Sequence, residues 1–404
     1  MKELKRFKKF KQQDYINIIS KNKINYLILN IIKIILVILF ILFIYKNNKD
    51  IPNLYCKING IKYLQKCINN LLTNKKIIYN NNNLPIISVI IPVYNCENDI
   101  QITIKSIQNQ NNIDFEIILI NDYSQDNTSI IINKLQKNDQ RIIIMNNKKN
   151  MGTFYSRSIG VLNSKGKYIF CIDNDDVFFD ENLFYNIYNK AIKNNYDIIE
   201  FKSYEIPNYH PHVKEIKESY FNHHKNNIYI QQPELGLFPI SRDFNYYPND
   251  FHIWGKCIKS VIYKNAVNLI GEKRIKFYNC WTEDISIIFI IFNIAQSFFF
   301  LDKYGIFHLD RRTSATYKLN EEHKFISELF LLDIIIDFIH NIEKNYKYIV
   351  QKALSIIDTN NINLLNKENK NYSNLIFKKL FNLKYININD KIKIKKKFNL
   401  TYDL

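Results

Sequence analysis

Residues 85–122 read PIISVIIPVYNCENDIQITIKSIQNQNNIDFEIILIND, and this stretch decides the fold. Residues 86–91 form a continuous apolar run, which is typical of a strand buried on both faces. Residues 99–108 then carry isoleucines at helical spacing, and residues 115–120 form a second apolar run. A strand, a helix and a strand in this order predict two parallel strands joined by a right-handed crossover.

The same alternation continues toward the C-terminus. Further strands are expected at residues 141–145, 168–172 and 197–201, and further helices at residues 129–135, 154–162 and 183–193. The fold class is therefore α/β, with a mainly parallel sheet and flanking helices. Ligands of such sheets bind beyond the carboxyl ends of the strands, so the residues after each strand are the candidates for function.

Those residues are strongly polar. They are Pro92, Tyr94, Asn95 and Glu97 after the first strand, Asn121, Asp122 and Ser124 after the second, and Asp173, Asn174, Asp175 and Asp176 after the fourth. Three acidic loops at one sheet edge repel one another unless a cation or a positively charged ligand joins them.

The net charge of +18 raises the question of a polyanionic partner. The excess of Lys and Arg lies at the two ends of the chain, whereas residues 85–200 contain 11 Lys and Arg against 14 Asp and Glu. A groove for nucleic acid needs the opposite sign, so no nucleic-acid partner is expected.

The N-terminus predicts a membrane anchor. A basic head at residues 1–23 precedes the apolar run LILNIIKIILVILFILFIY, and a span over residues 24–45 is close to the ~20 residues that cross a bilayer. A buried core helix and a cleaved signal peptide are the weaker alternatives. The basic head predicts a single-pass protein with a cytosolic N-terminus, a stem at residues 46–84, and the remaining chain lumenal or extracytoplasmic.

The polar loops resemble those of the family 2 glycosyltransferases. The resemblance covers residues 85–316 and rests on PIISVIIPVYNCE, EIILINDYSQDNT, NKKNMGTFYSRSIG and SKGKYIFCIDNDD, followed by WGK at Trp254 and WTED at Trp281. It implies a GT-A fold, which is Rossmann-like. It also implies transfer of a hexosyl or N-acetylhexosaminyl group from a nucleotide sugar, with inversion at the anomeric carbon. The expected donor is a UDP sugar. The acceptor would be a hydroxyl group of a glycan, lipid or protein.

The resemblance also implies roles for individual residues. The nucleotide sugar would contact Pro92, Tyr94, Asn95, Glu97, Asp122, Arg157, Asp173 and Asn174, and the metal ligands would be Asp173, Asp175 and His308. Alternate residues of a strand point the same way, so an Asp-x-Asp at a strand end offers two carboxylates to one ion. Such hard oxygen ligands suit Mn²⁺ or Mg²⁺.

The general base for the acceptor hydroxyl would be Asp284 or, failing that, Glu283. Two positions depart from the family, which usually has Gly at Tyr123 and Thr at Gln125. Trp254 and Lys256 are interpreted as a packing anchor.

Residues 317–404 are expected to form a helical extension that ends in a Lys-rich tail, beginning with an amphipathic helix within residues 320–350. Two other functions compete with sugar transfer. A catalytically silent nucleotide-sugar binding module would need neither carboxylate pair. A nucleotidyltransferase would need a Gly- and Arg-rich loop after the first strand, which VYNCEND is not.

Overall fold

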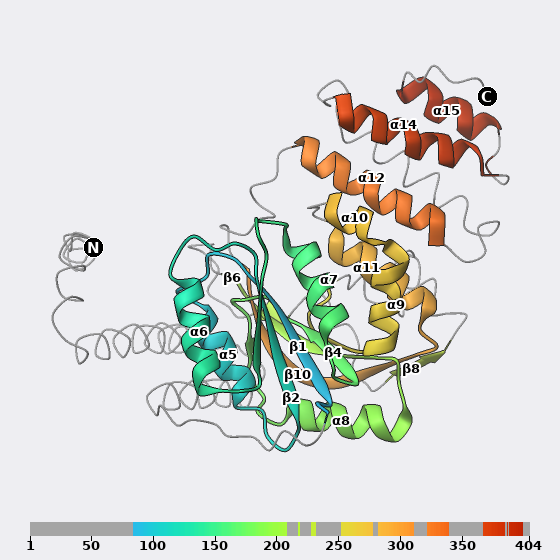
Figure 1. Cartoon of the computed structure of the whole chain (residues 1–404). Helices are drawn as coiled ribbons and strands as arrows, with labels where there is room; N and C mark the ends of the chain where they lie inside the picture. Colours follow the sequence, from blue (N-terminus) through green and yellow to red (C-terminus); the bar gives the residue numbers. More distant parts are fainter. Residues whose placement is uncertain are drawn as a thin grey trace, which may run out of the picture. The chain divides into compact units, whose positions relative to one another are not determined.

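The apolar runs of the sequence become the strands of one sheet, with helices on both of its faces (Figure 1). A computed structural model describes residues 84–207, 217–218, 228–231, 252–277, 282–310, 321–338, 367–383, 386 and 388–398. All of them lie in one compact unit of the chain, Lys76–His210 with Ile216–Leu404.

The strands of the described residues form the order β3-β2-β1-β4-β9-β6-β10-β5, with β7 paired to β6 and β8 to β10. Their bounds are β1 Ile87–Val93, β2 Phe115–Asn121, β3 Ile142–Asn146, β4 Tyr168–Cys171, β5 Val177–Phe178, β6 Ile198–Pro207, β7 Lys217–Glu218, β8 Ile228–Gln231, β9 Lys256–Lys259 and β10 Ser297–Asp310. The helices are α5 Ile100–Gln108, α6 Thr128–Asn138, α7 Thr153–Asn163, α8 Leu183–Asn194, α9 Ser260–Ile270, α10 Glu272–Phe277, α11 Glu283–Ile294, α12 Glu321–Phe338, α14 Lys367–Phe381 and α15 Ile388–Phe398.

Alternating side chains of the central strands build two cores, one on each face of the sheet. Ile90 of β1 points to the face covered by α7, α9, α11 and α12. Val89 and Ile91 point to the opposite face, which α5, α6 and α8 cover. A strand buried on both faces needs an unbroken apolar run, so the prediction from residues 86–91 is confirmed.

The prediction of a mainly parallel sheet holds only for its first half. β1, β2, β3 and β4 are parallel, but β9 enters between β4 and β6 and is antiparallel to both. β10 is parallel to β6 and antiparallel to β5 and β8. The sheet is therefore mixed. The four residues of β9 begin with a lysine, which gives no apolar run to recognise.

The C-terminal extension is helical where it is described, but α12 is not amphipathic as expected. Its residues Leu329–Ile336 are buried without interruption, because α12 packs between α11 and α14. An ion-pair network links α10, α12 and α14: Arg274 pairs with Asp333 and Asp337, and Lys379 pairs with the same two carboxylates. A helix covered on two sides loses the one-sided pattern of a surface helix.

Several predictions fall outside the described residues. The head, the span at residues 24–45 and the stem are among them, and no helix within the described residues is both long and apolar enough to cross a membrane. Three cysteines that are described, Cys96, Cys171 and Cys257, are buried free thiols.

Gly160 of α7 provides a test of the packing between helix and sheet. A Cβ atom there would lie 2.5 Å from Cγ2 of Ile90 and 2.6 Å from Cδ1 of Ile120. We expect Gly160→Ala to lower the free energy of unfolding by about 1–3 kcal/mol through overpacking, although Ala is the better helix former. Denaturant unfolding measures this. Leu162→Ala, at an exposed site of the same helix, is the matched control and should change stability by about 0.5 kcal/mol or less. Equal stability of Gly160→Ala and wild type would contradict the close approach.

Candidate functional site

The loops after β1 and β2 are tied together by side chains from both. The backbone N–H of Asn95 donates to Oγ of Ser124 at 3.1 Å, and the N–H of Gln125 donates to Oδ1 of Asn95 at 2.8 Å. The Oε2 atom of Glu97 accepts from the backbone and side-chain nitrogens of Asn127 at 3.0 and 2.7 Å. Asn95 and Glu97 therefore shape the edge on which a nucleotide is expected.

Two tyrosine rings from these loops are open to solvent. Tyr94 is 45% exposed and Tyr123 is 51% exposed. Tyr123 has a φ of +66°, a left-handed conformation that suits Gly, the residue usual at this position in the resembling enzymes. A bulky residue held there is strained, and such strain is typical of functional loops.

Asp122 is buried and fully engaged by the loop before α7. One of its oxygens accepts from the backbone N–H of Met151 and from Nδ2 of Asn147, each at 2.7 Å, and the other accepts from the N–H of Gly152 at 2.7 Å. The carboxylate thereby fixes the start of the helix that carries Arg157.

The four residues Asp173–Asp176 form a turn rather than the end of a strand. β4 ends at Cys171, and the N–H of Asp176 donates to the carbonyl of Asp173 at 3.3 Å. In such a turn the first and fourth residues come together. The strand alternation that was expected to pair Asp173 with Asp175 is therefore not present, and the carboxyl group of Asp176 lies beside that of Asp173. The run of four polar residues before the apolar Val177 was the sequence signal that could have indicated a turn here.

Asn174 ties this turn to neighbouring elements. Its Nδ2 donates to the carbonyl oxygen of Pro92 at 3.2 Å, and its own carbonyl accepts from Oγ1 of Thr103 at 2.9 Å. Pro92 and Asn174, both expected to touch the nucleotide, thus hold the ends of β1 and β4 together.

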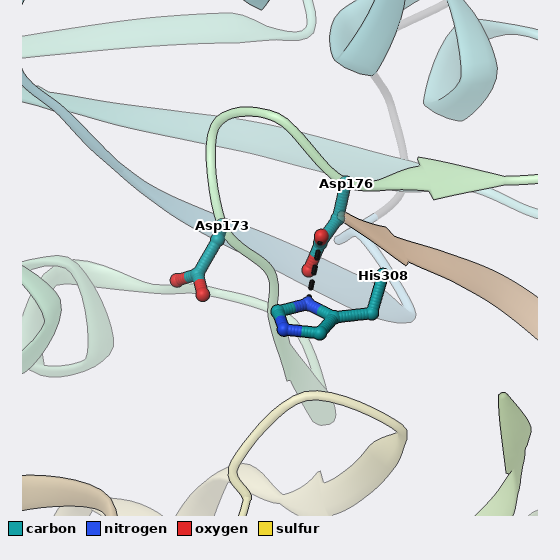
Figure 2. A group of neighbouring side chains, drawn as sticks. All are labelled: Asp173, Asp176 and His308. Atoms are coloured by element: carbon teal, nitrogen blue, oxygen red, sulfur yellow. Dashed lines mark hydrogen bonds and ion pairs between the residues drawn. The ribbon is translucent and has the colours of Figure 1, made fainter. Parts of the chain in front are cut away.

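Asp173, Asp176 and His308 bring ligand atoms within 4.8 Å of one another (Figure 2). The antiparallel pairing of β5 with β10 places Asp176 beside His308, and Oδ1 of Asp176 lies 2.9 Å from Nδ1 of His308. Burial alone would lower the pKa of His308, but the charges of Asp176, Asp173 and Asp175 raise that pKa to about 10. Among the described residues, these three form a group able to hold a metal ion.

Arg157 joins this group to the acidic pair at the start of α11. Its Nη2 donates to Oδ1 of Asp173 at 3.1 Å, and its Nη1 donates to Oε1 of Glu283 at 3.2 Å and to Oδ1 of Asp284 at 2.6 Å. The arginine side chain is only 4% exposed. Burial would lower the pKa of the guanidinium, but Asp284, Asp173 and Glu283 hold it well above its ordinary value, so the group stays charged.

Glu283 and Asp284 occupy different surroundings although they are adjacent. Burial raises the pKa of Glu283 to about 8, against the opposing effect of Arg157. The Asp284 side chain is 23% exposed, against 14% for Glu283, and its second oxygen accepts from the N–H of Ile253 at 3.5 Å. Asp284 is therefore the more accessible of the two carboxyl groups.

The structure brings five of the residues predicted from the sequence together. Asp173, His308, Arg157, Glu283 and Asp284 are linked through direct contacts or shared partners. Tyr94, Asn95 and Glu97 line the neighbouring loops instead. Such an arrangement can bind a cation, accept a proton and offer aromatic faces to a planar group.

Comparison with known proteins finds a family model that matches part of the chain. Residues 88–250 match the family model described as glycosyl transferase family 2. The chain is 43% identical over 95 residues to a hyaluronan synthase of Pasteurella multocida, 24% of this chain and 10% of that protein. It is 38% identical over 101 residues to an uncharacterized glycosyltransferase of Haemophilus influenzae, 25% of this chain and 40% of that protein. The chain thus spans between a tenth and two fifths of the length of these relatives.

Among solved structures, the chain is similar to S. aureus TarS 1–349 in complex with UDP-GlcNAc. The TM-score is 0.49 at 14% sequence identity, and the likeness covers 78% of this chain and 91% of that one. The same fragment in complex with UDP gives a TM-score of 0.47.

Proposed function

We propose that this protein transfers a sugar from a nucleotide-sugar donor to an acceptor hydroxyl group. The match of residues 88–250 to the glycosyl transferase family 2 model supports this proposal. One observation carries the proposal: the guanidinium of Arg157 contacts Asp173 on one side and Glu283 and Asp284 on the other. The carboxylates proposed to hold a cation for the diphosphate thus lie beside the proposed base for the acceptor hydroxyl group. Both lie at one edge of the sheet, where α/β proteins bind ligands.

The proposed reaction is a single displacement with inversion. The oxygen of the acceptor hydroxyl forms a bond to the anomeric carbon from the face opposite the nucleotide, and its proton passes to Asp284. The bond between that carbon and the diphosphate oxygen breaks, and the electron pair leaves with the nucleoside diphosphate. Asp284 is assigned this role because its side chain is more exposed than that of Glu283, which is the alternative base.

The residues around His308 fit a divalent cation. Two carboxylates and an imidazole are a donor set that Mn²⁺ accepts, and their ligand atoms lie within 4.8 Å of one another. We assign Asp173, Asp176 and His308 to Mn²⁺ or Mg²⁺, whose charge would balance that of the diphosphate when bound.

The proposal also covers the nucleotide of the donor and the location of the protein. Tyr94, with an exposed ring, and the bonded loops of Asn95 and Glu97 support binding of the nucleoside, UDP being our first choice. The acceptor is proposed to be a glycan, lipid or protein hydroxyl. The basic head and the apolar residues 24–45 support a membrane-anchored form with the catalytic region lumenal or extracytoplasmic.

A donor screen tests the proposed function. The full chain in detergent is incubated with UDP, GDP and dTDP sugars and a pool of acceptors, and release of nucleoside diphosphate is measured. Release above the slow hydrolysis of the donor, dependent on acceptor, is the expected result. Binding of a nucleotide sugar with no release from any donor would replace the proposal with a silent binding module.

A pair of neighbouring aspartates tests the metal assignment. We expect Asp176→Asn to weaken Mn²⁺ binding by about tenfold or more, because Asp176 lies beside both Asp173 and His308. Asp175→Asn is the matched control, since Asp175 lies outside this group of ligand atoms. Titration of free Mn²⁺ by electron paramagnetic resonance measures the affinity. The opposite ranking of the two variants would restore the pairing of Asp173 with Asp175.

A further inference from the structure

Trp254 lies against the histidine of the proposed metal site. The ring centroids of Trp254 and His308 are 4.4 Å apart and the ring planes differ by 15°. His252 stacks on the same indole at 4.6 Å and 21°. Trp254 is 3% exposed, so its surroundings define its position.

The buried ammonium group of Lys256 holds the segment that carries Trp254. Nζ of Lys256 donates to the carbonyl oxygen of His252 at 2.8 Å and lies 3.4 Å from Oε2 of Glu200 on β6. The carbonyl of Gly255 accepts from the N–H of Phe201 at 3.0 Å. Residues 252–256 are thus hydrogen-bonded to β6 and, through Lys256, to one another.

These contacts bear on His308 because an imidazole binds a cation only in the plane of its ring. Asp176 fixes one edge of that ring through Nδ1 (Figure 2). The flat indole of Trp254 fixes the plane, since rotation of His308 about its side chain would break the stacking. Partners that orient a ligating histidine commonly determine metal affinity.

We propose that Trp254 is a positioning residue that holds the imidazole of His308 in the plane needed to bind a divalent cation. Lys256 and Glu200 keep Trp254 in place. This inference rests on the metal site of the proposed function and extends it, because Trp254 itself supplies no ligand atom. The interpretation of Trp254 and Lys256 as a packing anchor thereby becomes a specific role.

The first test measures Mn²⁺ affinity of the full chain by electron paramagnetic resonance. Trp254→Leu, which removes the flat ring, should weaken binding about 10- to 100-fold, and Trp254→Phe, which keeps an aromatic face, should stay within about threefold of wild type. Circular dichroism checks the fold of both variants. Equal affinity of the folded Leu variant and wild type would overturn the positioning role while leaving the metal site intact. Absence of Mn²⁺ binding by wild type would overturn the metal site and this inference together.

The second test needs no change at Trp254. The chain has two tryptophans, and Trp281→Phe leaves Trp254 as the sole one. Paramagnetic Mn²⁺ bound beside His308 should quench the fluorescence of Trp254, with the same dissociation constant that electron paramagnetic resonance gives. Mg²⁺ should not quench this fluorescence. Mn²⁺ binding without quenching would show that the ion lies away from Trp254 and would overturn the inference even if Trp254→Leu fails to fold.

Discussion

Asp284→Asn is expected to lower the turnover number by about 10²–10⁴-fold. An amide cannot take up the proton of the attacking hydroxyl group at neutral pH. The effect on folding should be small. The amide oxygen can still accept from the N–H of Ile253, and Asp173 still pairs with Arg157. Initial rates with a saturating donor, together with thermal unfolding and nucleotide binding, measure the three quantities separately.

Glu283→Gln is the matched control for this experiment. Consecutive helix residues point about 100° apart, yet both carboxyl groups reach the same Nη1 of Arg157. Since the Glu283 side chain is the less exposed of the two, its amide variant should retain most of the activity. An inactive Glu283→Gln with an active Asp284→Asn would exchange the two roles. Normal turnover of both variants would place the base elsewhere.

Arg157→Met should lower the free energy of unfolding by about 1–3 kcal/mol, because it leaves partly buried carboxylates without their hydrogen-bond donor. The guanidinium is the shared cation of Asp173, Glu283 and Asp284, and its side chain is 4% exposed. Denaturant unfolding measures the loss. Activity should fall as well, because the base and the metal-site carboxylate are no longer held in one arrangement.

Two further variants separate charge from geometry at this position. Arg157→Lys keeps the charge but not the planar fork that reaches both sides, so its loss should be intermediate. Arg157→Met should also cost less in an Asp284→Asn background, because one carboxylate that needs the cation is gone. Wild-type stability of Arg157→Met would contradict the role of the cluster in folding.

The first half of the fold could be predicted because its signal is local. β1 and β2 are buried on both faces, which requires continuous apolar runs, and the helix between them, α5, follows the 3.6-residue period. β9 could not be found this way. Its first residue, Lys256, is buried beside Glu200, and that partner is far away in the sequence.

The site shows the same division. The motifs selected Asp173, His308 and the acidic pair, but they assumed a strand where the chain turns, so they did not predict that Asp176 lies beside Asp173 and His308. Arg157 was expected to meet the nucleotide. Its partners Glu283 and Asp284 are more than a hundred residues away, and no local pattern reports that contact.

The position of α12 determines how the chain can be shortened. Thr282, directly before the acidic pair of α11, donates from Oγ1 to the carbonyl of Ser327 on α12 at 2.6 Å, and α12 is itself covered by α14. A truncation at residue 316, where the resemblance to the family ends, would strip α11 of this cover and expose the apolar surface behind the base. An expression fragment designed on the family boundary would therefore lack part of its own core, and one that keeps the helices through α15 would retain it.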